Sequence, residues 1–380
     1  MTSDDFFKRI ETHFNKQLPF VIYRKPHQEK GSARLQSNTH LHFTENFTEK
    51  GFVFSPFDDN EKTILIPNEV SDVITTSYVS SSTSTSLGIN SVDTSQLNAN
   101  SAPTDSKTNH INLVKKGVEA IHTSDLKKVV LSRQETVNGS ETNPISIFKR
   151  LLKLYKSAFV YCWYHPKVGL WLGATPETLI KIEGNRFSIM ALAGTQDYNG
   201  SLDVVWKNKE QQEQQFVTDF IIDNLKPSVD SFKVSNVETV KAGNLVHLKT
   251  MISAQLKPAT PLKNVIKALH PTPAVCGLPK LIAKQFILKH ENYNREFYTG
   301  FLGELNCEIT IAPRSGKRNI ENRAYSVTRK STQLYVNLRC MQLKNQQAII
   351  YVGGGITESS NAESEWDETV SKSLVIKSVL

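Results

Sequence analysis

YVGGGITESSNAESEWDETVSK, at residues 351–372, runs from a strand through three glycines into a helix that presents acidic side chains. The glycines at 353–355 have no Cβ, so they let the backbone approach a ligand closely. The serine and asparagine residues that follow offer caps for the helix. Within the helix, Glu365, Glu368 and Lys372 are spaced i, i+3 and i+7, and at about 100° per residue they fall within about 60° of one another. One helix face therefore presents two carboxylates and an ammonium group beside a glycine-lined strand end.

That charged face has two possible meanings. Two carboxylates one turn apart suit a hard cation such as Mg²⁺, and the lysine suits a substrate anion. A solvated helix with Glu/Lys pairs, each worth about 0.2–0.5 kcal/mol, would show the same spacing. We also expect Trp366, Val370 and Leu374 to form a separate apolar stripe that packs against the protein. The segment alone leaves both interpretations open, and the rest of the chain has to decide between them.

Length and composition predict a globular protein. The chain has 380 residues, enough for one large domain or two ordinary ones, with 39% hydrophobic and 22% charged residues. Its formal charge is +8, but the lysines are scattered and the aromatic-basic pattern of a nucleic-acid-binding protein does not occur. We therefore expect no nucleic-acid partner, and an anionic small substrate explains the positive charge at least as well.

The sequence also indicates a cytoplasmic protein without a membrane partner. The first 14 residues mix acidic, basic and apolar side chains, unlike a signal peptide, and no apolar run reaches the length of a membrane span. Buried thiols are a better interpretation of the cysteines than a disulfide framework or a zinc site, because they lie far apart in apolar surroundings. The four cysteines are Cys162, Cys276, Cys307 and Cys340.

Periodicity predicts helices and strands along the chain, with two exceptions. Residues 76–109 are rich in Ser, Thr and Asn with almost no apolar pattern, so we expect a mobile loop before a helix at 110–123. Residues 312–330 are basic and polar and are typical of a hairpin excursion. After this excursion we expect strands at 333–342 and 348–353.

The first candidate catalytic side chain is a lysine in a strand. The run KVVLSR, at residues 128–133, is rich in β-branched residues, and alternation puts Lys128 on the same face as Val130 and Ser132. A desolvated lysine has a depressed pKa and can act as a base. The alternative is a lysine at the exposed start of an edge strand.

Two glutamates are further candidates. The turn GATPETL, at residues 173–179, delivers Glu177 to the head of a strand. A carboxyl beside such a partly apolar turn can hold a raised pKa and act as an acid, whereas the alternative is a turn carboxylate in water. In the helix predicted at 204–225, Glu213 lies on the line of the apolar stripe. A carboxylate there must be paired, protonated or metal-bound, so a functional role and a structural ion pair are both open.

Four other features add weaker candidates. His247 lies in the strand-like run LVHL, where a core histidine is the plainer interpretation. Arg339 lies between apolar neighbours in the middle of a predicted strand, which suggests a buried anionic partner. The segment HPTPAVCG, at 270–277, has two prolines that fix a rigid turn between helices. The segment AGT, at 193–195, is expected to end a strand at a corner where a ligand can approach the backbone.

In this order and at these separations, the motifs resemble the chorismate-utilising enzymes, which include isochorismate, salicylate, anthranilate and aminodeoxychorismate synthases. The resemblance covers residues 110–380, whereas residues 1–100 match only as the variable front half of such enzymes. It implies an α/β fold of the α+β type: one large domain whose antiparallel sheets pack like a sandwich, with helices on the outside. Six blocks carry the resemblance: KVVLSR at 128–133, GATPETL at 173–179, LAGT at 192–195, HPTPAVCG at 270–277, REFYTG at 295–300, and the opening stretch from GGGI at 353–356 to Lys372.

Within this family the turn at 270–277 is expected to separate the reactions. Relatives that install nitrogen share the pattern P-x-G-T-x-x-G-A-P-K there, whereas HPTPA is similar to isochorismate synthases. The resemblance thus implies a Mg²⁺-dependent isomerase that converts chorismate to isochorismate by attack of water at C2 and loss of the C4 hydroxyl. Such an enzyme serves menaquinone or siderophore biosynthesis and needs no glutamine amidotransferase partner. Salicylate synthase, which also eliminates pyruvate, and a non-catalytic chorismate-binding protein are the alternatives.

The resemblance also implies a role for each candidate residue. Lys128 is the general base and Glu177 the general acid. Mg²⁺, which neutralises a ring carboxylate, is held by Glu213, Glu365 and Glu368. Substrate is bound by Gly194, Thr195, His247, Ala274, Tyr298, Arg339, Gly354 and Lys372. Gln214 departs from the family pattern, because many relatives carry His there, so the shell around the metal is expected to differ.

Overall fold

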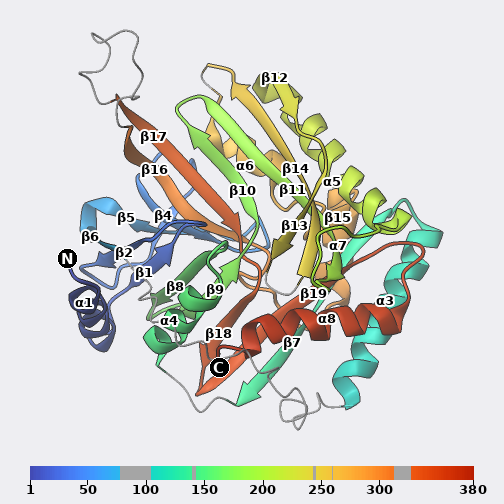
Figure 1. Cartoon of the computed structure of the whole chain (residues 1–380), viewed down its shortest axis with the longest axis horizontal. Coiled ribbons are helices and arrows are strands. Elements are labelled where there is room, and N and C mark those ends of the chain that lie inside the picture. Colours follow the sequence, from blue (N-terminus) through green and yellow to red (C-terminus); the bar gives the residue numbers. More distant parts are fainter. Residues whose placement is uncertain (78–103, 139–142, 243–244, 259, 312–326) are drawn as a thin grey trace.

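Two antiparallel sheets form the core of the computed structural model, with helices packed on the outside (Figure 1). The residues that the structure describes are 1–77, 104–138, 143–242, 245–258, 260–311 and 327–380. Across these residues the first sheet has nine strands in the order β15 (Gly277–Leu278), β7 (Lys128–Asn138), β19 (Gln347–Ile356), β18 (Cys340–Lys344), β9 (Gly169–Thr175), β8 (Phe159–His165), β1 (Phe20–Arg24), β2 (Lys30–Gln36) and β6 (Ser71–Ser77).

The second sheet has ten strands in the same part of the chain. Their order is β12 (Val229–Val234), β14 (Leu245–Leu256), β11 (Arg186–Asp197), β10 (Thr178–Glu183), β17 (Val327–Val336), β16 (Phe301–Ile311), β4 (Gly51–Ser55), β5 (Thr63–Pro67) and β3 (His42–Thr44), while β13 (Glu238–Ala242) pairs with β14. Every strand pairing that the structure describes is antiparallel, so the predicted sandwich-like fold is confirmed.

The helices cover the sheets from several sides. Helices α1 (Ser3–Asn15) and α4 (Pro144–Leu154) bury their apolar faces in one core cluster on the first sheet. Helices α5 (Asn208–Leu225) and α6 (Leu262–Leu269) do the same on the second sheet. Helices α3 (Thr104–Thr123), α7 (Lys280–His290) and α8 (Ala362–Lys377) pack around β7 and β19, where α8 crosses in front of the sheet (Figure 1). Two short 3₁₀ helices span Asn68–Val70 and Lys226–Ser228. No helix in the described part of the chain has the length and apolar character needed to cross a membrane.

An aromatic core fills the space between the two sheets. Strand β1 is buried on both faces: Val21 and Tyr23 face this inter-sheet core, whereas Phe20 and Ile22 face the helices on the other side. Strands buried on both faces are apolar without the alternation of a half-exposed strand. From the second sheet Phe52, with its neighbours on β4 and β5, completes the same cluster.

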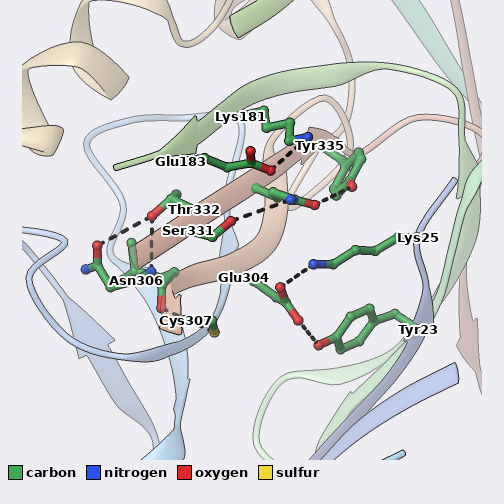
Figure 2. Close-up of polar contacts among 12 residues, drawn as sticks. Tyr23, Lys25, Lys181, Glu183, Glu304, Asn306, Cys307, Ser331, Thr332 and Tyr335 are labelled. Atoms are coloured by element: carbon green, nitrogen blue, oxygen red, sulfur yellow. Dashed lines mark hydrogen bonds and ion pairs between the residues drawn. The ribbon is translucent and has the colours of Figure 1, made fainter. Parts of the chain in front are cut away.

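A buried ionic network joins the sheets at the edge of this core. Glu304 on β16 accepts hydrogen bonds from Tyr23 at the end of β1 and from Lys25, whose Nζ lies 2.5 Å from Oε2 (Figure 2). Arg34 on β2 has its Nη2 atom 3.6 Å from the same carboxylate and donates to Cys307 Sγ at 2.9 Å. Buried charges are costly unless they are paired and hydrogen-bonded, and this glutamate is both.

Several predicted boundaries need correction. The loop expected at 76–109 overlaps β6, which ends at Ser77, and α3, which begins at Thr104; residues 78–103 lie outside the described part. The excursion expected at 312–330 overlaps β17, which begins at Val327, and residues 312–326 also lie outside the described part. The apolar pattern alone misses both ends, because polar residues continue the helix and the strand by backbone hydrogen bonding.

The strand predicted at 333–342 is in fact two strands, in different sheets. The chain leaves the second sheet at Val336 and enters the first at Cys340, so Arg339 lies in the crossing and not in mid-strand. Arg339 has φ +48°, in the left-handed region, which is incompatible with a regular strand. The arginine is thereby placed where the two sheets meet.

The opening stretch forms the strand and helix that its sequence predicts. Asn361 caps α8, because its side chain accepts hydrogen bonds from the backbone N–H groups of Glu363 and Ser364, each at 3.1 Å. Of the apolar stripe predicted on this helix, Trp366 is buried, but Val370 is only half-buried and Leu374 is 37% exposed. The buried face instead consists of Glu365, Trp366, Thr369, Ser373 and Ile376. Small polar side chains thus make the close contact with the protein where larger apolar ones were expected.

Candidate active site

A narrow cavity opens where β7 and β19 of the first sheet meet β11 and the β17–β18 crossing. It encloses about 90 Å³. Eleven of the thirteen predicted site residues line this cavity. The other two, Gly354 and Glu365, do not line it but lie next to Glu368, which does. The predicted residues in its wall are Lys128, Glu177, Gly194, Thr195, Glu213, His247, Ala274, Tyr298, Arg339, Glu368 and Lys372. The structure therefore gathers residues up to 244 positions apart around one space.

Lys128 is deeply buried in this wall. It is 2% exposed and has β15 on one side and β19 next to its strand on the other, so the exposed edge-strand alternative is excluded. Its Nζ atom lies 3.9 Å from Oε2 of Glu213 on α5. A Cβ added at Gly355 would lie 3.0 Å from both Lys128 Cε and Glu213 Oε1. The glycine at this position is therefore what lets the lysine and the glutamate meet above the strand.

Glu177 provides an acidic group in the same cavity. The turn before β10 holds it in place, since its backbone N–H donates to Thr175 Oγ1 at 3.3 Å. The side chain is 4% exposed, and burial raises the pKa of the carboxyl to about 8, although Lys128 and Arg339 both act to lower it. The alternative of a turn carboxylate in water is therefore excluded. At neutral pH the carboxyl holds a proton that it can donate.

Two further carboxylates from α8 face the glycine strand. The position of a Cβ on Gly354 would be 3.3 Å from Glu365 Oε2 and 3.8 Å from Glu368 Oε1. Glu365 is 2% exposed, and burial, together with the nearby charge of Glu368, raises the pKa of its carboxyl. Burial would also raise the pKa of Glu368, but Lys372, Lys209 and Arg339 outweigh burial and hold it below the ordinary value. The two carboxyl groups thus lie in one site, but the pKa of Glu365 is raised whereas the pKa of Glu368 is lowered.

Lys209 belongs to this group and was missed from the sequence. It lies on α5, and its Nζ atom is 2.5 Å from Glu365 Oε1. Lys372 makes the matching contact from α8, with its Nζ 2.5 Å from Glu368 Oε1. Lys209 precedes Glu213 by one helical turn, so the i, i+4 spacing is the signal that could have identified it. With Lys128 beside Glu213, each of the three glutamates has the side-chain nitrogen of one lysine as a neighbour.

Lys209 and Lys372 contact two of the three carboxylates proposed as metal ligands, so they affect whether a metal ion can bind there. Across the described ranges, no group of three or more His, Cys, Asp or Glu side chains is arranged to hold a metal ion. Even so, Glu365 Oε2 is buried and makes no hydrogen bond with any residue in the part of the chain that the structure describes. A buried, unpaired carboxylate oxygen is costly, and it suits a hard cation. The donor atoms are thus chemically appropriate for Mg²⁺, while two of the carboxylates are held by ammonium groups.

Two cationic side chains that can bind an anion, Arg339 and Lys372, also border the cavity. The guanidinium of Arg339 makes no hydrogen bond or ion pair with any residue in the described ranges, and it borders the cavity. Lys372 donates to the carbonyl of Gly353 at 2.9 Å in addition to its contact with Glu368. A free guanidinium beside a lysine is suited to a substrate carboxylate.

His247 and its neighbours form a neutral part of the wall. Nδ1 of His247 lies 2.9 Å from the carbonyl oxygen of Gly194 and 3.3 Å from Thr195 Oγ1. Burial and the charge of Arg339 lower the pKa of the histidine to about 3, so the ring is neutral. Gly194 has φ +71° and lies in a bulge of β11, which continues to Asp197 and does not end at this corner as predicted. Tyr298 lies nearby, stacked on Tyr351 with their ring centroids 5.5 Å apart.

Gln214 was expected to change the set of residues around the metal ion. In the structure its side chain makes hydrogen bonds with the second sheet. Its Nε2 donates to the Ala191 carbonyl at 3.1 Å and to Thr250 Oγ1 at 2.9 Å. The amide thereby ties α5 to the second sheet. It does not line the cavity, so the departure from the family pattern leaves the cavity wall itself unchanged.

The chain is similar in sequence to known proteins along most of its length. The sequence profile of the family described as "Chorismate binding enzyme" matches residues 64–327, and a related profile, "chorismate binding enzyme", matches residues 324–378. The isochorismate synthase MenF of Pasteurella multocida is 30% identical over 279 residues, which are 70% of this chain and 60% of that protein. The isochorismate synthase MenF of Escherichia coli is 25% identical over 72% of this chain and 60% of its own length. The alignments thus span about 60% of the length of these relatives.

Solved structures show the same fold. A putative 2,3-dihydroxybenzoate-specific isochorismate synthase, DhbC, from Bacillus anthracis superposes with a TM-score of 0.73 at 20% identity, covering 97% of this chain and 98% of that one. Anthranilate synthase component I from Streptococcus pneumoniae has a TM-score of 0.63 at 17% identity, covering 94% and 92%. With a profile that matches more than two thirds of its residues and a fold shared over nearly its whole length, the chain belongs to the chorismate-binding enzyme family.

Proposed function

We propose that the protein is an isochorismate synthase that isomerises chorismate to isochorismate. The observation that carries this proposal is the pairing of a buried amine, Lys128, with a protonated carboxyl, Glu177, in the wall of one cavity. Moving a hydroxyl group around a ring needs one group to accept a proton and another to donate one. Further support comes from the HPTPA turn, whose Ala274 lines the cavity, and from the similarity to isochorismate synthases.

The proposed reaction has two proton transfers, one at each of these groups. The amine of Lys128 takes a proton from a water molecule, and the resulting hydroxide attacks C2 of the ring. The double bonds shift, and the hydroxyl at C4 leaves as water with the proton that Glu177 donates. The ring thus gains one hydroxyl and loses another, and the proton now on Lys128 has to return to Glu177 before the next turnover. Because Glu177 has a pKa of about 8, it is ready to donate at neutral pH.

Binding of the substrate is assigned to the groups around these two. Arg339 and Lys372 hold carboxylates, with the backbone at Gly194, Thr195 and Gly354 close enough to assist. His247, Ala274 and Tyr298 form the wall beside the ring. The cavity of about 90 Å³ is smaller than the roughly 300 Å³ at which ligand sites usually begin, so side chains at its rim have to move when substrate enters.

Mg²⁺ is proposed as the cofactor, held by Glu213, Glu365 and Glu368. The support is the hard oxygen donor set and the unpartnered Oε2 of Glu365. When bound, such an ion supplies positive charge that offsets the charge of a substrate carboxylate. We further propose that the protein acts in the cytoplasm, on a small molecule and without an amidotransferase partner. The four cysteines support this compartment, because all are buried free thiols.

Incubation with chorismate and Mg²⁺, followed by chromatographic identification of the products, tests the proposal. Isochorismate without pyruvate is the expected product. Salicylate with an equal amount of pyruvate would instead make the protein a salicylate synthase, and anthranilate formed with ammonia would make it a nitrogen-installing relative. Binding of chorismate without turnover would indicate a non-catalytic chorismate-binding protein. The Lys128→Met variant, run in parallel, shows whether turnover belongs to this chain and not to a contaminant.

A further inference from the structure

A lysine that the proposed reaction does not use lies among the three carboxylates assigned to Mg²⁺. Lys209 belongs to the first turn of α5, and its Nζ atom is 2.5 Å from Oε1 of Glu365 on α8. Glu213 follows Lys209 by one turn on α5, and Glu368 follows Glu365 by one turn on α8. Burial would lower the pKa of Lys209, but the charges of Glu365, Glu213 and Glu368 outweigh it and raise the pKa. The amine is therefore charged at neutral pH.

Lys209 is held less firmly than the other lysine that contacts an α8 carboxylate. Lys372 has two partners, because its Nζ lies 2.5 Å from Glu368 Oε1 and donates to the carbonyl of Gly353 at 2.9 Å. Glu365 is the only hydrogen-bond partner of Lys209 among the residues that the structure describes. The side chain of Lys209 is 27% exposed, whereas that of Lys372 is 12% exposed. Lys209 thus has fewer contacts to lose and lies closer to water.

Glu365 cannot bind Lys209 and a metal ion equally well. Mg²⁺ binds its oxygen ligands at about 2.0–2.1 Å, so an ion on this carboxylate would lie within a few ångströms of the ammonium group. Like charges at such a separation repel strongly where water is largely excluded, and Glu365 is 2% exposed. Lysine carries its charge on a flexible stem, so the ammonium group of Lys209 can turn towards water when an ion enters.

We propose that Lys209 competes with Mg²⁺ for Glu365 and thereby sets the affinity of the metal site, an inference that rests on the proposed Mg²⁺-dependent function. The ammonium group pairs with a buried carboxylate that is otherwise costly to keep charged. The same contact means that an ion has to break an ion pair before it can bind. Lys209 therefore stabilises the arrangement of the carboxylates but weakens their binding of a metal ion.

The opposite role for this lysine makes the opposite prediction. A lysine that orients Glu365 towards the ion would strengthen metal binding, as residues that hydrogen-bond to metal ligands usually do, and its removal would weaken binding. A competing lysine weakens metal binding, so its removal should strengthen it. The sign of the change in affinity therefore separates competition from orientation.

Binding of Mn²⁺ to the full-length protein, without chorismate, tests the inference. Mn²⁺ prefers the same oxygen ligands as Mg²⁺, and free Mn²⁺ is measured by its electron paramagnetic resonance signal. Lys209→Met keeps an unbranched side chain and removes the charge, so it should bind Mn²⁺ roughly tenfold more tightly than the parent. The rise in melting temperature that Mn²⁺ causes should also be larger in this variant. Equal or weaker binding in Lys209→Met would overturn the inference and leave the metal site itself standing.

Three further variants make the test specific. Lys207→Met, at an exposed position two residues earlier that does not line the candidate active site, is the matched control and should bind Mn²⁺ as the parent does. Lys209→Arg keeps the charge and should bind no more tightly than the parent. Adding Glu365→Gln to Lys209→Met should remove the gain, because the ion then lacks the carboxylate for which the lysine competes.

The remaining outcomes contradict the inference in different ways. A gain that persists with Glu365→Gln, or that appears equally in Lys207→Met, would place the effect at another site and overturn the competition. Absence of Mn²⁺ binding in the parent and in every variant would overturn the assignment of Mg²⁺ to these glutamates, and the inference with it. Equal affinity in the parent and Lys209→Met would overturn the inference alone.

Discussion

Nζ of Lys128 lies 3.9 Å from Oε2 of Glu213, and both side chains border the cavity that also contains Glu177. This separation is close enough for charge attraction but too long for a hydrogen bond. The donors of the lysine are therefore not committed to the glutamate, and a water molecule can bind to the amine. The chain achieves this arrangement by placing the lysine on β7, between β15 and β19, the glutamate on a helix, and a glycine between them.

Replacing Lys128 tests its role as the base. Lys128→Met keeps an unbranched side chain in a site that is 2% exposed, but removes the amine. We expect the kcat for isochorismate formation to fall by about 10²- to 10⁴-fold, the usual contribution of general acid–base catalysis. Steady-state kinetics with chorismate measures this fall. Lys127→Met, at the exposed neighbouring position, is the control and should keep its activity. A Lys128→Met enzyme within tenfold of the parent would remove the lysine from the mechanism.

The carboxyl of Glu177 should control activity at alkaline pH. Because its pKa is about 8, the proton that it donates is lost as the pH rises through that value. The profile of kcat/KM should therefore fall on the alkaline side with a midpoint near pH 8. In Glu177→Gln the activity should be low at every pH, and this midpoint should be absent. An alkaline limb that persists in Glu177→Gln would assign the ionisation to another group.

The same carboxyl should make the protein less stable at high pH. Its pKa is about 8 in the folded chain and 4.5 when unperturbed, so between these values the folded state binds more protons. Its stabilising contribution is complete below pH 4.5 and is lost as the pH rises through about 8. The loss is at most about 5 kcal/mol, at about 1.4 kcal/mol per pKa unit. Glu177→Gln, which is never charged, should therefore unfold at a higher urea concentration than the parent at pH 9, and this advantage should shrink towards pH 5. A difference that does not vary with pH would contradict the raised pKa.

Local patterns were sufficient to predict much of this site. Strand alternation places Lys128, and helix periodicity places Glu213, among apolar residues, while Glu177 was predicted from a partly apolar turn before a strand; the structure buries all three. Asn361 was predicted from the same kind of local signal, since a capping side chain acts within one turn of its helix. Such residues can be found because burial follows from spacing alone. Which of them meet one another depends on strand order, and for that the family resemblance was needed.

Features that depend on tertiary contacts were missed. Arg339 was placed in mid-strand, because nothing in the apolar run at 333–342 marks the point where the chain passes from one sheet to the other. Lys209 was overlooked because it resembles other surface lysines until α8 brings Glu365 against it. Leu374 was expected to be buried, but the contacts of α8 use the smaller Thr369 and Ser373. In each case a long-range neighbour outweighs the local pattern.

Gly355 should be essential for the geometry of the site. A Cβ at this position would lie 3.0 Å from Lys128 Cε and from Glu213 Oε1, so Gly355→Ala has to displace one of these side chains by a few tenths of an ångström. We expect kcat to fall on the order of 10- to 100-fold, because small misplacements of catalytic groups are costly. The melting temperature should change little. Gly31→Ala on β2 is the control, since its nearest neighbour would be 3.5 Å away, and it should keep full activity.

The ionic network between the sheets should contribute to stability without affecting catalysis. Glu304, on β16 of the second sheet, is 9% exposed and contacts Tyr23 on β1 and Lys25, which directly follows β1 (Figure 2). The same carboxylate lies 3.6 Å from Nη2 of Arg34 on β2 of the first sheet. Replacing one member of a buried ion pair leaves the others buried and unpaired, at a cost of about 3–5 kcal/mol. Glu304→Gln keeps the shape and removes the charge, so we expect a loss of about 3 kcal/mol in urea unfolding, with kcat unchanged in the folded enzyme.

The matched control for this prediction lies on the same strand. Glu308 pairs with Lys50 at 2.6 Å, but both side chains are about half exposed, at 57% and 46%. Water screens such a pair and solvates either partner when the other is lost. Glu308→Gln should therefore unfold at the same urea concentration as the parent. Equal effects of Glu304→Gln and Glu308→Gln would mean that the buried network does not hold the sheets together, and that the aromatic core between them is sufficient to do so.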